Sequence, residues 1–286
     1  MKLNKYTITE GRDFKLKDHE TRDKGSYESQ TDAAEDMALN LDKLQVLQDK
    51  LYAQNQYAIL LIIQAMDAAG KDGLIKHVMS GVNPQGCQVF SFKQPSTEEL
   101  DHDYLWRCVK NLPERGRIGI FNRSYYEDVL VVRVHNLVHG SQVPQRLIDK
   151  NLWVDRFGQI RNFEDYLVEN GIIPIKIFLN VSKDEQKQRF LDRIEDPSKH
   201  WQFSAGDISE RALWDDYMNA YEDAIKHTST EKSHWHIIPA DRKWFARLLV
   251  SEIIVQKMEG LNLVYPVLAP EELVKLEESK QLLLNE

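Results

Sequence analysis

The feature that most constrains this chain is an unbroken apolar run, YAILLII at 57–63, which is rich in branched side chains. A run of this kind is typical of a strand buried on both faces of a parallel sheet. Four further short runs repeat the signal: CQVFSF (87–92), RIGIFN (117–122), IIPIKIFLNV (172–181) and WHIIPA (235–240). Helical patterns separate these runs. The alternation predicts right-handed crossovers and a three-layer α/β fold, with helices on both faces of a parallel sheet.

Three of the predicted helices have recognisable starts. Ser96 with Glu99, and Ser182 with Glu185, fit the capping box, in which two side chains satisfy free N–H groups of the first turn. Asp241 stands directly before KWFARLLVSEIIVQKM, where an N-cap residue is expected. These residues fix the predicted starts of helices that follow the second, fourth and fifth strands.

The chain is expected to form one compact domain with an extension at each end. Residues 1–30 are polar and show no hydrophobic period, whereas the spacing of apolar residues over 32–54 predicts an amphipathic helix. The apolar positions of that helix are Met37, Leu41, Leu44, Leu47 and Leu51. No repeat and no linker rich in Pro, Gly or Ser divides the rest. We therefore predict an N-terminal extension over 1–30, a domain over 31–260 and a helical C-terminal extension over 261–286.

Composition and charge exclude several classes of function. The formal net charge of -8 argues against nucleic-acid binding, so any polyanionic ligand must meet a local cluster of positive charges. The longest apolar run, 58–63, is far shorter than the ~20 residues that span a bilayer, and the start MKLNKYTITEGRDF has no hydrophobic signal region. We expect a cytoplasmic protein without membrane contact. Cys87 and Cys108 have neither a C-x-x-C nor a zinc spacing and are expected to be reduced.

The segment after the first strand has the order of a phosphate-binding loop. AMDAAGKDG (65–73) follows the strand directly and precedes the helical pattern LIKHVMSGV. In a P-loop, backbone N–H groups at a helix N-terminus bind phosphate oxygens, and Lys71, expected to be exposed, would add a full positive charge. The match to G-x-x-x-x-G-K-[ST] is incomplete, because Ala65 replaces the first Gly and Asp72 occupies the Ser/Thr position. The alternative is a turn in which small residues only permit close packing.

The residues of this loop that we expect to bind phosphate are Ala68, Ala69, Gly70, Lys71, Asp72 and Gly73. Asp67 lies within the same loop and would face a bound phosphate. A bare carboxylate there would be repelled unless a cation intervened. Asp67 is therefore predicted to be a Mg²⁺ ligand, either direct or through water.

A second polar segment, FNRSYYEDVLVVRVH (121–135), begins at the end of the third strand. Asn122, Arg123, Glu127 and Asp128 gather near the carboxyl edge of the sheet, where open α/β sheets bind ligands. Arg123 can bind two phosphate oxygens at once, which suits a phosphoryl group whose charge builds on its equatorial oxygens. The alternative for Arg123 is a structural ion pair with a neighbouring acid.

Together the two segments resemble the signatures of the polyphosphate kinase 2 family, D-A-A-G-K and F-[DN]-R-S-x-Y, here at Asp67–Lys71 and Phe121–Tyr126. The resemblance covers roughly residues 30–260. It implies a fold similar to the P-loop nucleoside-monophosphate kinases, with a mobile helical lid. It also implies a reversible, Mg²⁺-dependent transfer of phosphate between polyphosphate and nucleotides, for which we expect Mn²⁺ to substitute.

The resemblance also assigns roles to single residues. Asp67 and Asn122 are expected to help hold the metal ion, and Lys71 and Arg123 to hold phosphates. We also predict Glu127 as a metal ligand, and the five residues together as the catalytic set. Further phosphate contacts are predicted for four arginines: Arg117, Arg133, Arg189 and Arg193.

Many members of the family have Asp where this chain has Asn122. The subgroup called class III is similar to this chain in GKDG, NRSYYEDVLVVRVH and KHVMSGVNPQG. That subgroup phosphorylates nucleoside mono- and diphosphates, so the resemblance implies AMP and ADP as acceptors, with guanine nucleotides as further candidates. We also expect a homo-oligomer, either a dimer or a tetramer.

Residues 182–216 are interpreted as the lid, because they are dense in charge and broken by Pro197. Arg189 and Arg193 lie one helical turn apart and share a face, which we expect to meet polyphosphate. The alternative is a solvated helix on which Arg189 pairs with Glu185. His135 and His139 are spaced like zinc ligands, but no third ligand completes the pattern, so no metal is expected there.

Two other functions are compatible with these residues. One is a P-loop kinase that takes its phosphate from ATP, as nucleoside or thymidylate kinases do. The other is a nucleotide-binding module without activity, in which Ala65, Asp72 and Asn122 mark the loss of catalysis. The joint presence of Asp67, Lys71 and Arg123 favours an active enzyme.

Overall fold

A computed structural model describes residues 2–286 and shows a six-stranded sheet with helices on both faces. The strand order is β1-β6-β5-β2-β4-β3. The strands are β1 (Thr7–Ile8), β2 (Ala58–Ala65), β3 (Cys87–Ser91), β4 (Ile118–Asn122), β5 (Ile172–Asn180) and β6 (Trp235–Pro239). All five predicted strands are confirmed and run parallel to one another, while the edge strand β1 pairs antiparallel with β6.

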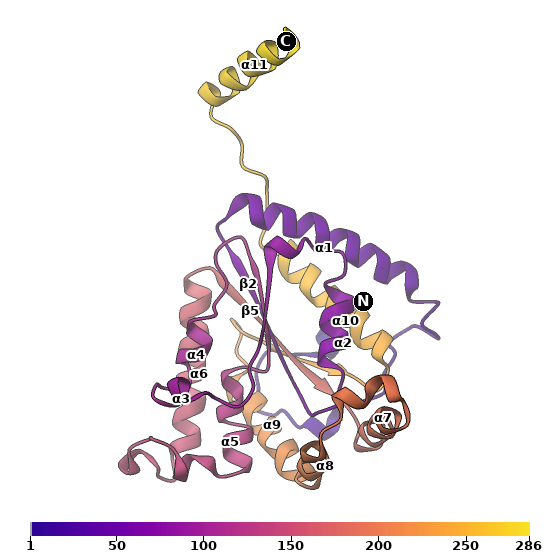
Figure 1. The fold of residues 1–286 in the computed structure, drawn as a ribbon, viewed down its shortest axis with the longest axis vertical. Helices are drawn as coiled ribbons and strands as arrows, with labels where there is room; N and C mark the ends of the chain where they lie inside the picture. The colour runs from indigo at the N-terminus through magenta and orange to yellow at the C-terminus, as the bar shows by residue number, and fades with distance from the viewer. Residues whose placement is uncertain (1) are drawn as a thin grey trace.

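The helices form the two outer layers of the sandwich (Figure 1). One layer contains α1 (Ala34–Gln54), α2 (Lys71–Val78) and α10 (Lys243–Glu259), and the other contains α6 (Leu152–Glu169) and α9 (Trp214–Thr228). The predicted three-layer α/β architecture is therefore confirmed. Within residues 2–286, no helix combines the length and the apolar character that a membrane span requires.

Shorter helices occupy the connections: α3 (Thr97–Leu100), α4 (Trp106–Val109), α5 (Val131–Val134), α7 (Lys183–Glu195) and α8 (Ala205–Ala212). Short 3₁₀ turns lie at Leu3–Lys5, Leu16–Asp18, Pro84–Gly86, Tyr125–Asp128, Leu137–Gly140, Gln145–Leu147 and Pro197–Gln202. In the segment predicted as the lid, α7, the turn at Pro197–Gln202 and α8 follow one another. The C-terminal helix α11 (Pro270–Leu284) projects away from the body of the molecule (Figure 1).

Strand register determines where the ligand-binding edge lies. Ile63 of β2 is opposite Asn122 of β4, so the carboxyl ends of these parallel strands are neighbours. Arg123 continues the pairing by one residue, since its N–H donates to Ile63 O at 3.1 Å. The loop that follows β2 is thereby brought beside the polar segment that follows β4. Two segments that lie far apart in the sequence form one edge.

The N-terminal segment is more closely attached to the domain than its polar sequence indicated. Its strand β1 extends the sheet, and Tyr6, Phe14 and Leu16 are buried in the core. Thr7 Oγ1 also lies 3.0 Å from His236 Nδ1 on β6. These apolar residues show no period because each contacts the domain as a separate anchor.

Of the three predicted helix caps, one is complete, one is half formed and one is absent. Ser96 and Glu99 form the complete capping box. Ser182 Oγ accepts from Glu185 N at 3.1 Å, but the Glu185 carboxylate accepts from Arg189 Nε at 2.9 Å. The second box is therefore half formed, because the guanidinium is a charged donor and holds the carboxylate.

The predicted N-cap role of Asp241 is wrong. Helix α10 begins at Lys243, and no side chain caps its first turn. The Asp241 carboxylate accepts instead from Ser182 N at 2.8 Å and from Thr21 Oγ1 at 2.9 Å. This acid joins the end of β6 to the start of α7 and to the N-terminal segment, which are contacts that local spacing does not reveal.

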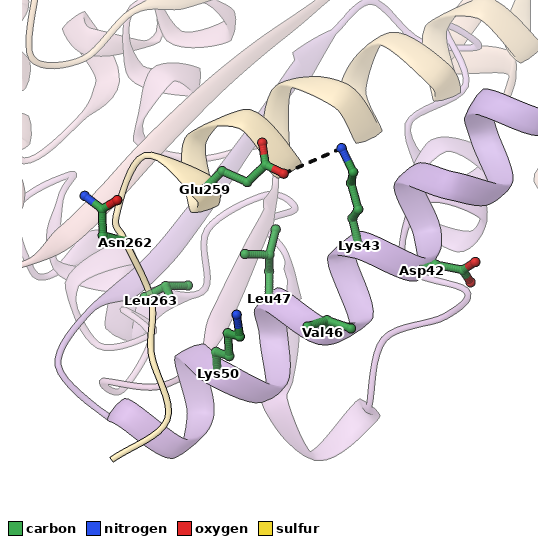
Figure 2. Close-up of a pocket in the computed structure, with 8 residues that line it drawn as sticks. All are labelled: Asp42, Lys43, Val46, Leu47, Lys50, Glu259, Asn262 and Leu263. Atoms are coloured by element: carbon green, nitrogen blue, oxygen red, sulfur yellow. Dashed lines mark ion pairs between the residues drawn. The ribbon is translucent and has the colours of Figure 1, made fainter. Parts of the chain in front are cut away.

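A shallow groove of about 460 Å³ lies between α1 and the end of α10 (Figure 2). Val46, Leu47 and Leu263 form its apolar lining, and Lys43 pairs with Glu259 across it at 3.6 Å. Helix α10 starts at the carboxyl edge of the sheet, after β6, and ends in this groove. The groove therefore lies at the opposite end of α10 from the loop that follows β2.

Candidate active site

The loop between β2 and α2 has the tight backbone that phosphate binding requires. Ala68 has φ 59° and Gly70 has φ 102°, so both lie in the left-handed region. Arg189 fixes this conformation from outside, because Nη1 donates to Ala68 O at 3.1 Å and to Ala69 O at 2.7 Å. The adjacent side chain of Gln186 donates to Asp67 O at 2.9 Å. Helix α7 therefore holds three consecutive loop carbonyls.

This anchoring orients the loop N–H groups. In a trans peptide the N–H points opposite to the preceding C=O, so the N–H groups of Ala68, Ala69 and Gly70 face away from α7. Ala69 N–H closes a turn onto Met66 O at 3.3 Å. The N–H groups of Ala68 and Gly70 are the ones left to meet an anion, at the N-terminus of α2.

Lys71 stands at the first position of α2. Its Nζ donates to Ala65 O, the last carbonyl of β2, at 3.1 Å and to Met66 O, the first carbonyl of the loop, at 3.3 Å. Burial lowers the pKa of Lys71, and the nearby charge of Asp67 opposes that shift. The expectation of an exposed lysine is thus wrong: the side chain is partly buried, and its contacts with protein oxygens are neutral carbonyls.

Arg123 lies between two carboxylates. Its Nη2 is 2.7 Å from Asp67 Oδ1, and its Nη1 is 3.9 Å from Glu127 Oε2. Burial disfavours the charged guanidinium, but Glu127 and Asp67 outweigh it and raise the pKa of Arg123. Its backbone has φ 64°, a strained conformation for a residue with a side chain, and such strain is common at functional sites. The ion pair considered from the sequence exists, and it lies within the phosphate-binding edge.

Asn122 and Glu127 complete the cluster at this edge. The Asn122 side-chain amide donates to Asp72 Oδ1 at 2.7 Å, which ties the end of β4 to the first turn of α2. Burial raises the pKa of Glu127, against the charges of Arg123 and Lys71. Asp67, Lys71, Asn122, Arg123 and Glu127, which we predicted as a set, therefore lie together.

A divalent cation fits this cluster only with help from the substrate. Among residues 2–286, no group of three or more His, Cys, Asp and Glu side chains is arranged to hold a metal ion. Mg²⁺, however, usually binds to one or two carboxylates, with waters and substrate phosphates completing its shell. Asp67 and Glu127, on either side of Arg123, supply two carboxylates of this kind. The donor set is compatible with Mg²⁺ or Mn²⁺ bound together with phosphate.

Helix α8, in the segment predicted as the lid, lies near the cluster. Burial and the charge of Asp67 raise the pKa of Asp207, so Asp207 lies near the loop, and Arg193 Nη1 is 3.6 Å from its carboxylate. Glu210 of α8 bonds to His135 Nε2 at 2.8 Å and accepts from Tyr217 at 2.6 Å. His135 is thus part of the contact between the end of α5 and α8.

The predicted outer arginines are dispersed. Arg117 precedes β4, at the amino edge of the sheet, and pairs with Glu114 at 3.7 Å. It cannot share a phosphate with Lys71, and its predicted role is wrong. Arg133 pairs with Asp223 of α9 at 2.7 Å. Arg193 pairs with Asp207, which lies near the loop, so Arg193 is the outer arginine beside the cluster.

Arg189 also differs from its predicted role. It is 4% exposed, and besides the loop carbonyls it donates to Ala240 O at 2.6 Å and to Glu185 Oε1 at 2.9 Å. A side chain enclosed in this way does not line an open channel. Arg189 positions the loop backbone, because its contacts join α7, the loop and the end of β6.

Sequence reasoning missed Gln186, Asp207 and Arg247 at this edge. Gln186 and Asp207 stand in a charged helical stretch, where no local signal separates a buried contact from a solvated one. Arg247 belongs to an apolar helix pattern, yet its guanidinium lies beside Gly73 in the first turn of α2. Only tertiary packing identifies these three.

The two tyrosines of the second signature face away from the cluster. The hydroxyl groups of Tyr125 and Tyr126 each donate to Glu164 Oε1 at 2.8 Å. Glu164 Oε2 also accepts from Lys176 Nζ at 2.6 Å, and both members of this pair are buried. The tyrosines therefore anchor the segment whose backbone presents Arg123.

Comparison with known proteins gives a consistent set of relatives. Residues 26–264 match the family model described as polyphosphate kinase 2. The chain is 50% identical over 287 residues to the ADP-polyphosphate phosphotransferase of Rhodopseudomonas palustris, covering 100% of this chain and 99% of the relative. It is 46% identical over 265 residues to the AMP/ADP-polyphosphate phosphotransferase of Meiothermus ruber, covering 92% and 96%. The crystal structure of polyphosphate kinase 2 from Arthrobacter aurescens superposes with a TM-score of 0.83 at 41% identity, covering 93% of each chain.

Proposed function

The chain belongs to the polyphosphate kinase 2 family and phosphorylates AMP and ADP from inorganic polyphosphate, and we propose that Lys71 and Arg123 carry the transfer. The observation that supports these roles is their position at one sheet edge, beside a loop whose N–H groups are oriented for phosphate. Both cations are partly buried, so their charges act more strongly than they would in water. Asp67 and Glu127 hold Arg123 in place from two sides.

The proposed reaction is a direct displacement. An oxygen of the acceptor phosphate attacks the terminal phosphorus of polyphosphate, a new P–O bond forms, and the bridging P–O bond breaks with its electron pair on the shortened chain. Lys71, Arg123 and the loop N–H groups neutralise the charge that develops on the transferred phosphoryl group. The acceptor oxygen is already ionised at neutral pH, so no strong general base and no covalent enzyme intermediate are needed.

We further propose that Asp67 and Glu127 hold Mg²⁺ or Mn²⁺, with Asn122 at the rim of the same site. When bound, the ion supplies positive charge to the phosphate oxygens and reduces their repulsion. The Asn122 amide nitrogen already donates to Asp72, which leaves its carbonyl oxygen as the ligand atom. Asp207 of the lid would add a third carboxylate near the phosphates, at the point where α8 lies near the cluster.

Guanine nucleotides are proposed as secondary acceptors, and a dimer or tetramer as the working form; both, like a cytoplasmic location, remain predictions.

The two alternatives from the sequence lose support. Full-length relatives at 46% and 50% identity carry names of polyphosphate phosphotransferases, which favours polyphosphate over ATP as donor. A module without activity would have no reason to keep Asp67, Lys71 and Arg123 in mutual contact range.

One assay tests these roles together. The purified chain is incubated with Mg²⁺, long-chain polyphosphate and AMP, ADP or GMP, and the nucleotides are then separated. We expect ADP and ATP from AMP, with smaller amounts of guanine products. Replacing Mg²⁺ with Mn²⁺ should preserve the reaction, and EDTA should abolish it. Full turnover in EDTA would contradict the metal proposal, whereas retained turnover in Arg123→Ala would contradict the role of the arginine.

A further inference from the structure

An arginine approaches each of the two glycines of the GKDG segment. A Cβ added at Gly70 would lie 3.7 Å from Arg189 Nη1, and one added at Gly73 would lie 3.8 Å from Arg247 Nη2. One arginine therefore lies beside the loop and the other beside the first turn of α2, close to the two glycines that flank Lys71 in the sequence. Arg189 comes from the lid segment and Arg247 from α10.

The two guanidinium groups differ in what they contact. Arg189 donates to loop carbonyls, to Ala240 O and to Glu185, so its donors are in use. The guanidinium of Arg247 forms no hydrogen bond or ion pair with another residue of the described chain, 2–286. Partial burial lowers its pKa, and no carboxylate opposes that shift. A guanidinium carries five N–H donors, so Arg247 retains its capacity to bind an anion.

Lys243 reinforces this positive region. It stands four residues before Arg247 on α10, so the two side chains share a face of the helix. Burial, followed by the charge of Arg189, lowers the pKa of Lys243, although Glu185 and Asp192 oppose the shift. Like charges at this spacing repel each other, and partial burial strengthens the repulsion. An anion bound between them would remove that cost.

We propose that Arg247 and Lys243 bind the phosphates of polyphosphate that lie beyond the reacting end of the chain. The inference rests on the proposed function, because it extends the donor path past Lys71. Helix α10 packs against α2, so the path runs from the loop over the first turn of α2 to α10. Polyphosphate carries about one negative charge per phosphate, and its distal units need such partners on an acidic protein. Because Gly73 has no side chain, polyphosphate can pass close to the protein backbone there.

The test compares chain lengths of the donor. Arg247→Gln and Lys243→Gln are assayed with long-chain polyphosphate and with tripolyphosphate, at several salt concentrations. Arg247→Gln should raise KM for the long chain about tenfold, because it removes charged hydrogen bonds. KM for tripolyphosphate and for AMP should stay unchanged, as should kcat. The salt dependence of KM for the long chain should weaken by about one unit of log–log slope per cation removed.

Lys257→Gln is the matched control, because Lys257 is also a partly buried cation of α10 but lies in its last turn, away from the loop. Calorimetric titration of the wild type and of each variant with long polyphosphate, without nucleotide, reports binding independently of turnover. Arg247→Lys should keep most of the affinity. If the wild type turns over polyphosphate and the folded variants bind both chain lengths as the wild type does, this inference alone is refuted. A wild type that cannot use polyphosphate would refute the proposed function and this inference with it.

Discussion

Lys71 and Lys176 are both lysines removed from water, and burial lowers the pKa of each. Lys176, inside β5, pairs with Glu164 at 2.6 Å and donates to Thr228 O at 2.7 Å, and its side chain is 0% exposed. Lys71 donates to two neutral carbonyls, while Asp67 interacts with it only through its charge. The charge of Lys176 is thus neutralised within the protein. The charge of Lys71 remains able to meet a phosphate, and this distinction separates the structural region from the catalytic one.

The same division runs through the segment after β4. Asn122, Arg123 and Glu127 belong to the cluster at the sheet edge, whereas Tyr125 and Tyr126 reach into the buried network around Glu164. The buried network around Glu164 is expected to determine stability, and the cluster at the sheet edge to determine turnover. The following variants test this separation, from the largest expected effect to the smallest.

Lys71→Met should reduce kcat by about 10²–10³-fold, the typical effect of removing one electrostatic contact to a transition state. The free energy of unfolding should change by less than about 1 kcal/mol, because the variant also removes the cost of partly burying a charge. Steady-state kinetics and urea unfolding check the two effects. Turnover within threefold of the wild type would place Lys71 outside the catalytic set.

Lys176→Met should have the opposite profile. It leaves Glu164 buried without its cation, and breaking such a pair typically costs about 3–5 kcal/mol. Turnover per folded molecule should stay close to the wild-type value. Combining Lys176→Met with Glu164→Gln should restore part of the stability, because the unpaired charge is then gone. Equal losses of kcat in Lys176→Met and Lys71→Met would show that the two regions are not separable.

Arg189→Ala should lower stability and kcat together. The lost guanidinium leaves buried carbonyls of Ala68, Ala69 and Ala240 without donors, at a cost of about 1–3 kcal/mol. KM for polyphosphate and for AMP should shift alike, since the loop backbone is affected rather than a contact with one substrate. Arg189→Lys should restore neither stability nor kcat, because one ammonium group cannot reproduce the planar fork of donors on a guanidinium. A selective rise of KM for polyphosphate would restore the role in a channel that we expected from the sequence.

Asn122→Asp should have the smallest effect. The new carboxylate would face Asp72, which now accepts from the Asn122 amide at 2.7 Å, so the two acids would separate. An added charge near the acceptor corresponds to ~1 kcal/mol, or a change of about fivefold in the ratio of AMP to ADP turnover. Initial rates with each nucleotide measure this ratio. If the ratio is unchanged and both rates are retained, this position does not select the acceptor.

The sequence predicted the sheet and the core of the site for identifiable physical reasons. A strand buried on both faces must be apolar, so YAILLII and the four similar runs gave five strands correctly. Parallel strands place their carboxyl ends at one edge, and the observed register of β2 and β4 brings the loop before Lys71 to the segment that contains Arg123. Both motifs are local in the chain, and their side chains lie at strand ends, where their positions follow from the sheet.

The errors have one physical cause, which is that the direction of a side chain depends on distant partners. Arg189 shares a face with Arg193 in the sequence, yet its guanidinium enters the core to reach Ala69 O. Asp241 precedes a helix but binds Ser182 and Thr21 instead. Arg247 gave no signal, because a partly buried cation without a partner cannot be recognised from spacing alone.

Donor choice tests the central claim most directly. The purified chain with Mg²⁺ is given polyphosphate with AMP in one reaction and ATP with dTMP in another, and the products are separated by chromatography. We expect ADP and ATP to form in the first reaction and to be nearly absent when Lys71→Met replaces the wild type. We expect no comparable transfer in the second reaction. Faster phosphorylation of dTMP from ATP than of AMP from polyphosphate would contradict the account.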